Sequence, residues 1–152
     1  MEAYRTRPRR RGRTVDHPIA VSALLADDGY RPTVVVAGLL HDVLEDTDVT
    51  PGELRERFGP DVERLVEALT QDTAIGKYGE RKAALRRQIL DAGPEAAIVS
   101  LADKTAKLQS TQVRPKRRQM AHYAASLDGI VARYGDSHLS GRLSEQLQRW
   151  PD

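Results

Sequence analysis

The sequence predicts an all-α fold, an irregular bundle of about seven to eight helices. Apolar residues recur at intervals of three and four residues, glycine and proline divide the chain into segments of helix length, and no segment alternates as a half-buried strand does. A chain of 152 residues is long enough to bury one core. We therefore expect one helical domain over residues 14–152, preceded by a basic segment at residues 1–13.

The first two helices are predicted from the prolines at their starts. His17-Pro18 begins the first helix, because proline fits the first turn, and Gly29 follows its end. Pro32 begins the second helix, which we expect to continue to about residue 46. Residues 34–40 within it are apolar nearly all round, so this helix should be buried.

Six further helices are expected downstream. The sequence Thr-Pro-Gly-Glu at residues 50–53 has the pattern of a capping box, and the short helix that it begins should stop at Gly59. Pro60 then begins another helix, with apolar residues at helical spacing. The remaining four are expected at residues 79–91, 94–110, 115–134 and 140–150.

Composition excludes several classes of protein. The chain has no cysteine, so a disulfide framework and a thiolate metal site are both excluded. No apolar run reaches the roughly 18–20 residues that a membrane span needs, and the N-terminus lacks the apolar region of a secretory signal. We therefore expect a cytoplasmic protein with no membrane partner, and self-association as a homo-oligomer stays open.

Charge is distributed unevenly along the chain. Residues 1–13 contain six arginines and one glutamate, whereas the remainder has slightly more acidic than basic residues. Such a basic segment either binds polyphosphate or nucleic acid, or is a solvated tail. Nucleic acid is not the partner that we expect.

Ionisable residues follow the apolar run of the second helix, where burial would be costly. His41, Asp42, Glu45 and Asp46 come directly after residues 34–40. Burying such groups costs several kcal/mol unless they are paired or bind a cation. Helical spacing lets all four side chains face one cleft.

Two more residues extend this set. Asp103 is a lone carboxylate at the end of an apolar helical run, and His17 stands at the start of another helix. Together with His41 and Asp42 they provide two imidazoles and two carboxylates. These ligands suit Mn²⁺, Fe²⁺, Co²⁺ or Zn²⁺ better than Ca²⁺. Four protein ligands on a six-coordinate ion would leave positions for water and a substrate phosphate.

In order and spacing these motifs resemble those of the HD-domain hydrolases of the RelA/SpoT type. The resemblance is carried by His17-Pro18, by residues 41–47 (HDVLEDT) and by residues 101–104 (LADK), with further likeness at residues 58–62 and 80–82. It implies an HD-domain helical bundle. It also implies that the chain removes pyrophosphate from the 3′ position of guanosine tetra- or pentaphosphate, (p)ppGpp, so the expected partner is a guanosine polyphosphate.

The resemblance further implies roles for the ionisable residues. The positions that bind one metal ion in that family, usually Mn²⁺, are here His17, His41, Asp42 and Asp103. The positions that orient or activate the attacking water are Glu45 and Asp46. A metal lowers the pKa of bound water and screens phosphate charge, while a carboxylate takes the proton, so the family chemistry agrees with these residue types.

Substrate contacts are expected mainly from basic residues. Arg9 and Arg11 lie in a segment that resembles a basic turn of the family, whose arginine contacts guanine or phosphate. Lysines near the expected metal ligands complete the positive surface. The further expected substrate-binding residues are Lys82, Lys104, Lys107 and Ser110.

Lys107 and the short N-terminus keep other functions open. Lys107 stands where the family usually has asparagine, so a point charge replaces a neutral amide. One alternative is therefore an HD phosphohydrolase that dephosphorylates another nucleoside mono- or triphosphate, modified ones included, in a specialised pathway. The second alternative is a non-catalytic nucleotide or nucleic-acid binder that uses the basic segment.

Three other residues are given no role in the chemistry. His122 and His138 belong to no motif, so we expect ordinary surface or core positions for them. Tyr78 would be able to stack on a base, but packing is the simpler interpretation.

Overall fold

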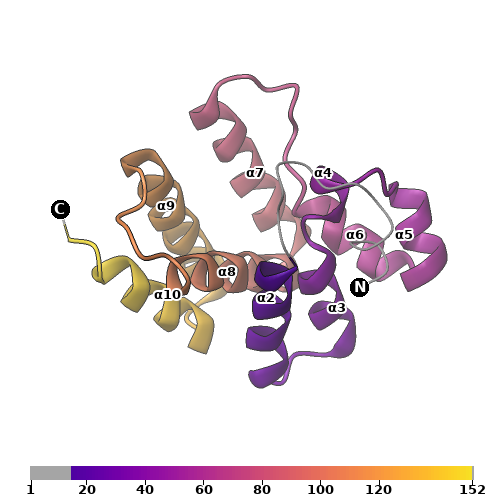
Figure 1. Cartoon of the computed structure of the whole chain (residues 1–152), viewed down its shortest axis with the longest axis horizontal. Helices are drawn as coiled ribbons and strands as arrows, with labels where there is room; N and C mark the ends of the chain where they lie inside the picture. Colours follow the sequence, from indigo (N-terminus) through magenta and orange to yellow (C-terminus); the bar gives the residue numbers. More distant parts are fainter. Residues whose placement is uncertain (1–14, 152) are drawn as a thin grey trace.

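The computed structural model describes residues 15–151, and within them the chain is helical without a strand (Figure 1). The all-α prediction is confirmed. The helices are α2 (Asp16–Asp27), α3 (Pro32–Leu40), α4 (Val43–Asp46), α5 (Pro51–Phe58), α6 (Pro60–Ala68), α7 (Tyr78–Ala92), α8 (Pro94–Gln109), α9 (Arg117–Tyr134) and α10 (His138–Gln148). None of these helices has the length and apolar character of a membrane span. The basic segment, with Arg9 and Arg11, lies outside the described residues.

Helix α8 forms the centre of the bundle. It contacts α2, α3 and α6 on one side and α7, α9 and α10 on the other, and it lies between these groups in Figure 1. Its alanines explain the close packing, because Ala96, Ala97, Ala102 and Ala106 are all buried and keep neighbouring backbones near. A residue near the middle or end of α8 therefore faces several helices at once.

Helices α2 and α3 pack closely through a glycine. A Cβ atom at Gly38 would lie 2.4 Å from Leu25 Cδ1 and 3.4 Å from Val21 Cγ1. The first distance is below any real contact, so a side chain at this position requires Leu25 to shift. The contact brings the start of α2, which carries His17, near the end of α3.

The second predicted helix is broken where we expected it to continue. Helix α3 ends at Leu40, and α4 begins at Val43, so His41 and Asp42 lie in the break. The His41 side chain explains part of this break, because its Nδ1 donates to the Gly38 carbonyl at 2.6 Å and competes with the backbone for that acceptor. The break sits where the sequence motif begins.

Helix starts agree with local signals where those signals are strong. Thr50 Oγ1 accepts from the Glu53 backbone N–H at 3.2 Å, as the capping pattern predicts. Helix α10 begins earlier than predicted, because Ser137 and Ser140 form a capping box with each other. The usual box has Glu or Gln at its fourth position, and serine there hides the signal in the sequence.

Candidate metal centre and active site

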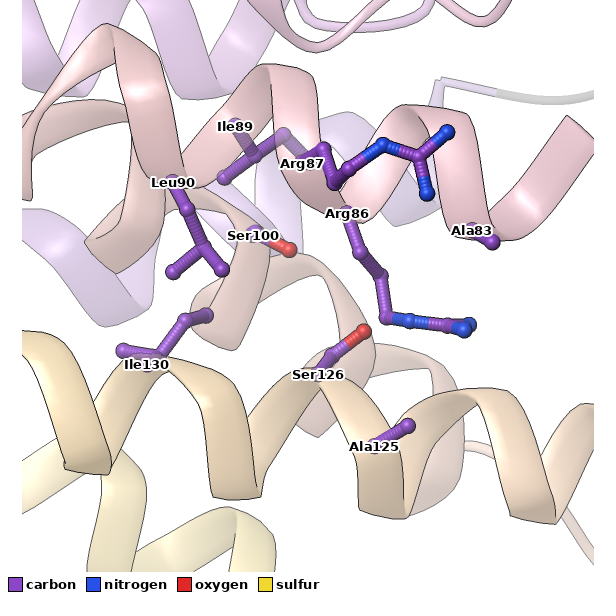
Figure 2. A pocket seen from close by; sticks show the side chains of 9 residues that line it. All are labelled: Ala83, Arg86, Arg87, Ile89, Leu90, Ser100, Ala125, Ser126 and Ile130. Carbon is purple, nitrogen blue, oxygen red and sulfur yellow. The ribbon is translucent and has the colours of Figure 1, made fainter.

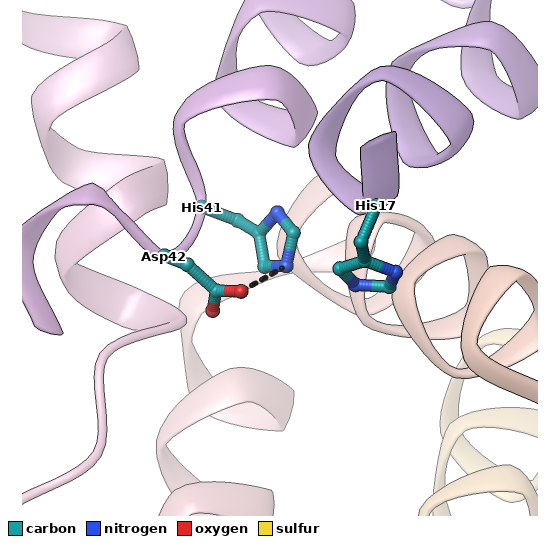
Figure 3. A group of neighbouring side chains, drawn as sticks. All are labelled: His17, His41 and Asp42. Atoms are coloured by element: carbon teal, nitrogen blue, oxygen red, sulfur yellow. Dashed lines mark ion pairs between the residues drawn. The ribbon is translucent and has the colours of Figure 1, made fainter. Parts of the chain in front are cut away.

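Two imidazoles and two carboxylates meet beside the centre of α8. His17 comes from α2, His41 and Asp42 come from the break between α3 and α4, and Asp103 comes from α8. Ligand atoms of His17, His41 and Asp42 all lie within 4.8 Å of one another, and Figure 3 shows these side chains converging. The two imidazole rings lie edge to face, with centroids 5.4 Å apart.

Asp103 joins the two imidazoles. Its Oδ1 lies 2.7 Å from His17 Nε2 and 3.2 Å from His41 Nε2. Asp42 Oδ2 lies 3.2 Å from the same His41 nitrogen. All four predicted metal ligands are therefore brought together, although they come from three separate parts of the chain.

The four side chains are arranged to share a cation. A carbonyl oxygen cannot donate, so His41 Nδ1 carries a proton for Gly38, and His41 Nε2 faces two carboxylates. Burial opposes charge on His41, yet Asp103 and Asp42 hold its pKa well above the ordinary value. Burial likewise opposes charge on Asp103, yet His41 and the hydrogen bond to His17 hold its pKa well below the usual range. A proton or a divalent metal ion satisfies the set, so the donor chemistry fits a metal.

A large cavity opens from this centre. It has a volume of about 910 Å³, within the range of ligand pockets, and runs along α8 between α7 and α9. The acidic residues that line it are Asp42, Glu45 and Asp103. The basic residues that line it are Lys82, Lys104, Lys107, Arg114, Lys116 and Arg118. The cavity therefore carries a surplus of positive charge and suits a ligand with several negative charges.

Glu45 lies in the cavity wall next to the metal centre. Its Oε1 accepts from the Gln71 backbone N–H at 3.0 Å. Burial raises the pKa of Glu45, and the Gln71 hydrogen bond offsets part of this effect. A raised pKa moves a carboxylate toward the value that suits a general base at neutral pH. Asp46 differs, because it is buried and does not line the cavity.

Two of the expected substrate-binding lysines are held firmly in the wall. Lys82 Nζ donates to Gln71 Oε1 at 3.0 Å. Lys104 is 4% exposed, donates to Ser100 Oγ at 2.8 Å and lies 5.5 Å from the Tyr123 ring centre. Burial lowers the pKa of both lysines. Each places an ammonium group at the cavity in a fixed position.

Of the remaining expected substrate contacts, Lys107 and Ser110 belong to the described residues, and they differ in position. Lys107 lies one helical turn beyond Asp103 and lines the cavity from an exposed position. Ser110 does not line it, and its Oγ donates instead to the Lys107 carbonyl at 3.0 Å. The neighbouring Thr111 lines the cavity.

The structure adds residues that the sequence analysis left without a role. Tyr78 and His122 both line the cavity, the first from α7 and the second from α9. The Arg118 guanidinium stacks over Tyr78, 4.3 Å from the ring centre. His122 is buried, as one of the two expected outcomes, and its Nδ1 accepts from Arg86 at 2.8 Å. No motif marks these residues, because only the packing of α9 beside α7 brings them to the site.

Comparisons with known proteins point in one direction. The profile of the family described as "HD domain" matches residues 2–132. A human relative, guanosine-3′,5′-bis(diphosphate) 3′-pyrophosphohydrolase MESH1, is 41% identical over 97 residues, which cover 62% of this chain and 54% of that protein. A protein of Aquifex aeolicus (strain VF5) described as guanosine-3′,5′-bis(diphosphate) 3′-pyrophosphohydrolase is 36% identical over 109 residues, which cover 69% of this chain and 16% of that protein.

A solved structure extends the similarity to the whole fold. It is described as a metazoan ortholog of SpoT that hydrolyzes ppGpp, and it superposes with a TM-score of 0.77 at 28% identity. The match covers 97% of this chain and 88% of that one. The curated relatives are longer, since the aligned part spans about half of the human protein.

Proposed function

This chain belongs to the HD domain family, and we propose that it is a metal-dependent phosphohydrolase. We propose further that its reaction is removal of the 3′-pyrophosphate from (p)ppGpp. The observation that carries the proposal is the cluster of His17, His41, Asp42 and Asp103 at one end of a cavity with a surplus of positive charge. The relatives named above are described as enzymes with this activity, which supports the choice of substrate.

The metal ion would be held by His17, His41, Asp42 and Asp103, and we propose Mn²⁺ among the ions that these ligands suit. When bound, such an ion lowers the pKa of a coordinated water and screens phosphate charge. His41 is oriented for this role by its Nδ1 hydrogen bond to Gly38, which directs Nε2 toward the other ligands.

Glu45 is proposed as the base that accepts a proton from the attacking water. It lines the cavity beside Asp42, and burial raises its pKa. Asp46 is proposed to help to position the water, as the family resemblance implies. Because Asp46 does not line the cavity, its effect would pass through the short helix α4, which also carries Glu45.

Lysines are proposed to bind the phosphates. Lys82 and Lys104 present fixed ammonium groups at the wall, and Lys107 adds a positive charge at an exposed position. Positive groups with low reorganisation stabilise the charge that develops on a phosphate during transfer. Contacts from Arg9, Arg11 and Ser110 stay predictions from the sequence.

The experiment is hydrolysis of ppGpp by purified protein loaded with Mn²⁺. Release of GDP and pyrophosphate, separated by chromatography, is the expected result. Glu45→Gln should lower kcat by about 10²–10⁴-fold while the metal content is retained. Glu56→Gln, at an exposed position on α5, is the matched control and should keep full activity.

Asp103→Asn distinguishes the metal ligands from the base. It should reduce both the metal content and the activity, since one anionic ligand is lost. Intact ppGpp after incubation with the fully loaded protein would refute the proposed substrate. Full metal content in Asp103→Asn would refute the ligand assignment.

Lys107 favours a second candidate, a phosphohydrolase that acts on another nucleotide. An exposed ammonium at this place would attract any polyphosphate, without the hydrogen-bond pattern of an amide. A panel of nucleoside mono- and triphosphates with product analysis separates the two, because this candidate releases phosphate from a 5′ position. The cytoplasmic location and the oligomeric state stay predictions.

A further inference from the structure

A second, smaller cavity lies between α7 and α9. Its volume is about 230 Å³, and Ser100 of α8 lies at its back (Figure 2). Ile89 and Ser100 line both this cavity and the larger one, so the two cavities share a wall. The smaller cavity contains none of the proposed metal ligands or water-handling residues.

An unpartnered hydroxyl points into the smaller cavity. Ser126 is 5% exposed, and its Oγ has no hydrogen-bond partner among residues 15–151. Figure 2 shows this hydroxyl directed from α9 toward α7, on the side of Arg86. Buried hydroxyls are almost always hydrogen-bonded, so the orphan group indicates that the cavity receives a polar atom.

Further donors gather at the same end of the cavity. Arg86 Nη1 donates a hydrogen bond to His122 Nδ1, so the other N–H groups of the guanidinium can donate to another acceptor. Ser100 Oγ accepts from Lys104, so the hydroxyl proton of Ser100 is not used in that contact. Arg87 lines the cavity too, and within residues 15–151 no acidic residue does. The polar end is therefore built for an anion.

The opposite end of the cavity is apolar. Leu90 of α7 and Ile130 of α9 face each other there, with Ile89 beside them (Figure 2). Ile89 and Ile130 are buried and Leu90 is partly buried, so this end offers an apolar surface. A ligand that fills the whole cavity must therefore combine one anionic group with a compact apolar body.

We propose that this cavity is a binding site for a small monocarboxylate with a branched aliphatic body. The carboxylate accepts hydrogen bonds from Arg86 and Ser126, and the aliphatic body lies between Leu90 and Ile130. The volume supports about six carbon atoms, since an apolar cavity of roughly 150 Å³ already admits benzene. This site is separate from the proposed catalytic function and does not depend on it.

Occupancy of the site is coupled to the larger cavity through two contacts. Arg86 donates to His122, and Ser100 accepts from Lys104, and both His122 and Lys104 line the larger cavity. A carboxylate bound beside Arg86 would neutralise positive charge next to the wall that the two cavities share. The ligand therefore weakens the binding of phosphates in the larger cavity, and phosphates weaken the binding of the ligand by the same factor.

Titration calorimetry with 4-methylpentanoate tests the site on the full chain. The expected result is saturable binding of one carboxylate per chain. The alcohol 4-methylpentan-1-ol has the same body without the charge and should bind at least about tenfold more weakly. Absence of saturable binding, or equal binding of the acid and the alcohol, would overturn the proposal.

Two alanine-to-leucine variants on α9 locate the ligand. Ala125 lines the cavity, so Ala125→Leu should fill it and weaken binding at least about tenfold. Ala121 is exposed on the same helix and lines neither cavity, so Ala121→Leu is the matched control and should bind as the parent does. Equal affinities in the two variants would place the ligand elsewhere and overturn the assignment.

Ser126→Ala separates binding from folding. It should weaken carboxylate binding without lowering the melting temperature, because the hydroxyl has no partner among the residues that the structure describes. A lower melting temperature with unchanged binding would show a structural role and refute the assignment of Ser126.

The coupling between the two cavities is tested by measuring the Kd of inorganic pyrophosphate with and without saturating 4-methylpentanoate. The Kd should rise in the presence of the carboxylate, and an unchanged Kd would refute the coupling.

Discussion

Replacement of His122 by asparagine should flatten the dependence of stability on pH in the acid range. His122 is buried in the cavity wall, and Arg86 donates to its Nδ1. Burial, followed by the charges of Lys104, Lys82 and Arg86, lowers the pKa of His122 to about 3, with Asp103 opposing. The imidazole is therefore neutral in the folded protein at every pH at which the fold is usually studied.

The direction of the effect follows from proton binding in the two states. An unfolded His122 takes up a proton as the pH falls through 6.5, whereas the folded protein does not until about 3. The free energy of unfolding therefore keeps its full contribution from neutral His122 above pH 6.5, and this contribution is lost progressively as the pH falls below 6.5. At pH 5 the loss is about 2 kcal/mol, which lowers Tm by about 4–8 °C in a protein of this size.

The assay is unfolding followed by far-ultraviolet circular dichroism at pH 7 and pH 5. Both samples contain a chelator, so that metal binding does not add its own pH dependence. Asparagine can accept from Arg86 but does not titrate, so His122→Asn should lose about 2 kcal/mol less than the parent between these pH values. Equal losses in the parent and His122→Asn would refute the reasoning.

Three further changes test packing, charge and capping. Gly38→Ala places a Cβ 2.4 Å from Leu25 Cδ1, so it should cost about 1–3 kcal/mol in thermal unfolding, and an unchanged Tm would show that Leu25 moves freely. Lys107→Asn should raise KM for a polyphosphate substrate several-fold and reduce its salt dependence, with kcat nearly retained; a fall in kcat alone would contradict a binding role. Thr50→Ala removes the acceptor for the Glu53 N–H and should cost about 1 kcal/mol in urea unfolding, whereas an unchanged midpoint would contradict it.

Local signals predicted most of the helices. Pro32, Pro51, Pro60 and Pro94 each stand at the first position of a helix, because proline fixes a backbone angle without reference to distant residues. The break after Leu40 was not predicted, since the apolar pattern and helical spacing continue through it. It depends on a side chain, that of His41, bonding back to its own helix.

The metal centre was more predictable than the cavity. The motif residues alone indicated His17, His41, Asp42 and Asp103, and the structure brings them together. Motif spacing, in contrast, carried no information about the wall that α9 provides. Tyr78, His122 and the smaller cavity follow from how α7 and α9 pack, and that packing is set by apolar contacts between distant residues.

The metal centre also has a consequence for assembly. Its ligands are 86 residues apart between His17 and Asp103 and 62 apart between His41 and Asp103, so they meet only after α2, α3 and α8 have docked. An ion held there would act as a removable cross-link for the native topology. At a free concentration one hundred times its Kd, such an ion adds about 2.7 kcal/mol to the free energy of unfolding. Metal binding would then require that the three helices are correctly docked, and a chelator would remove this stabilisation without breaking a covalent bond.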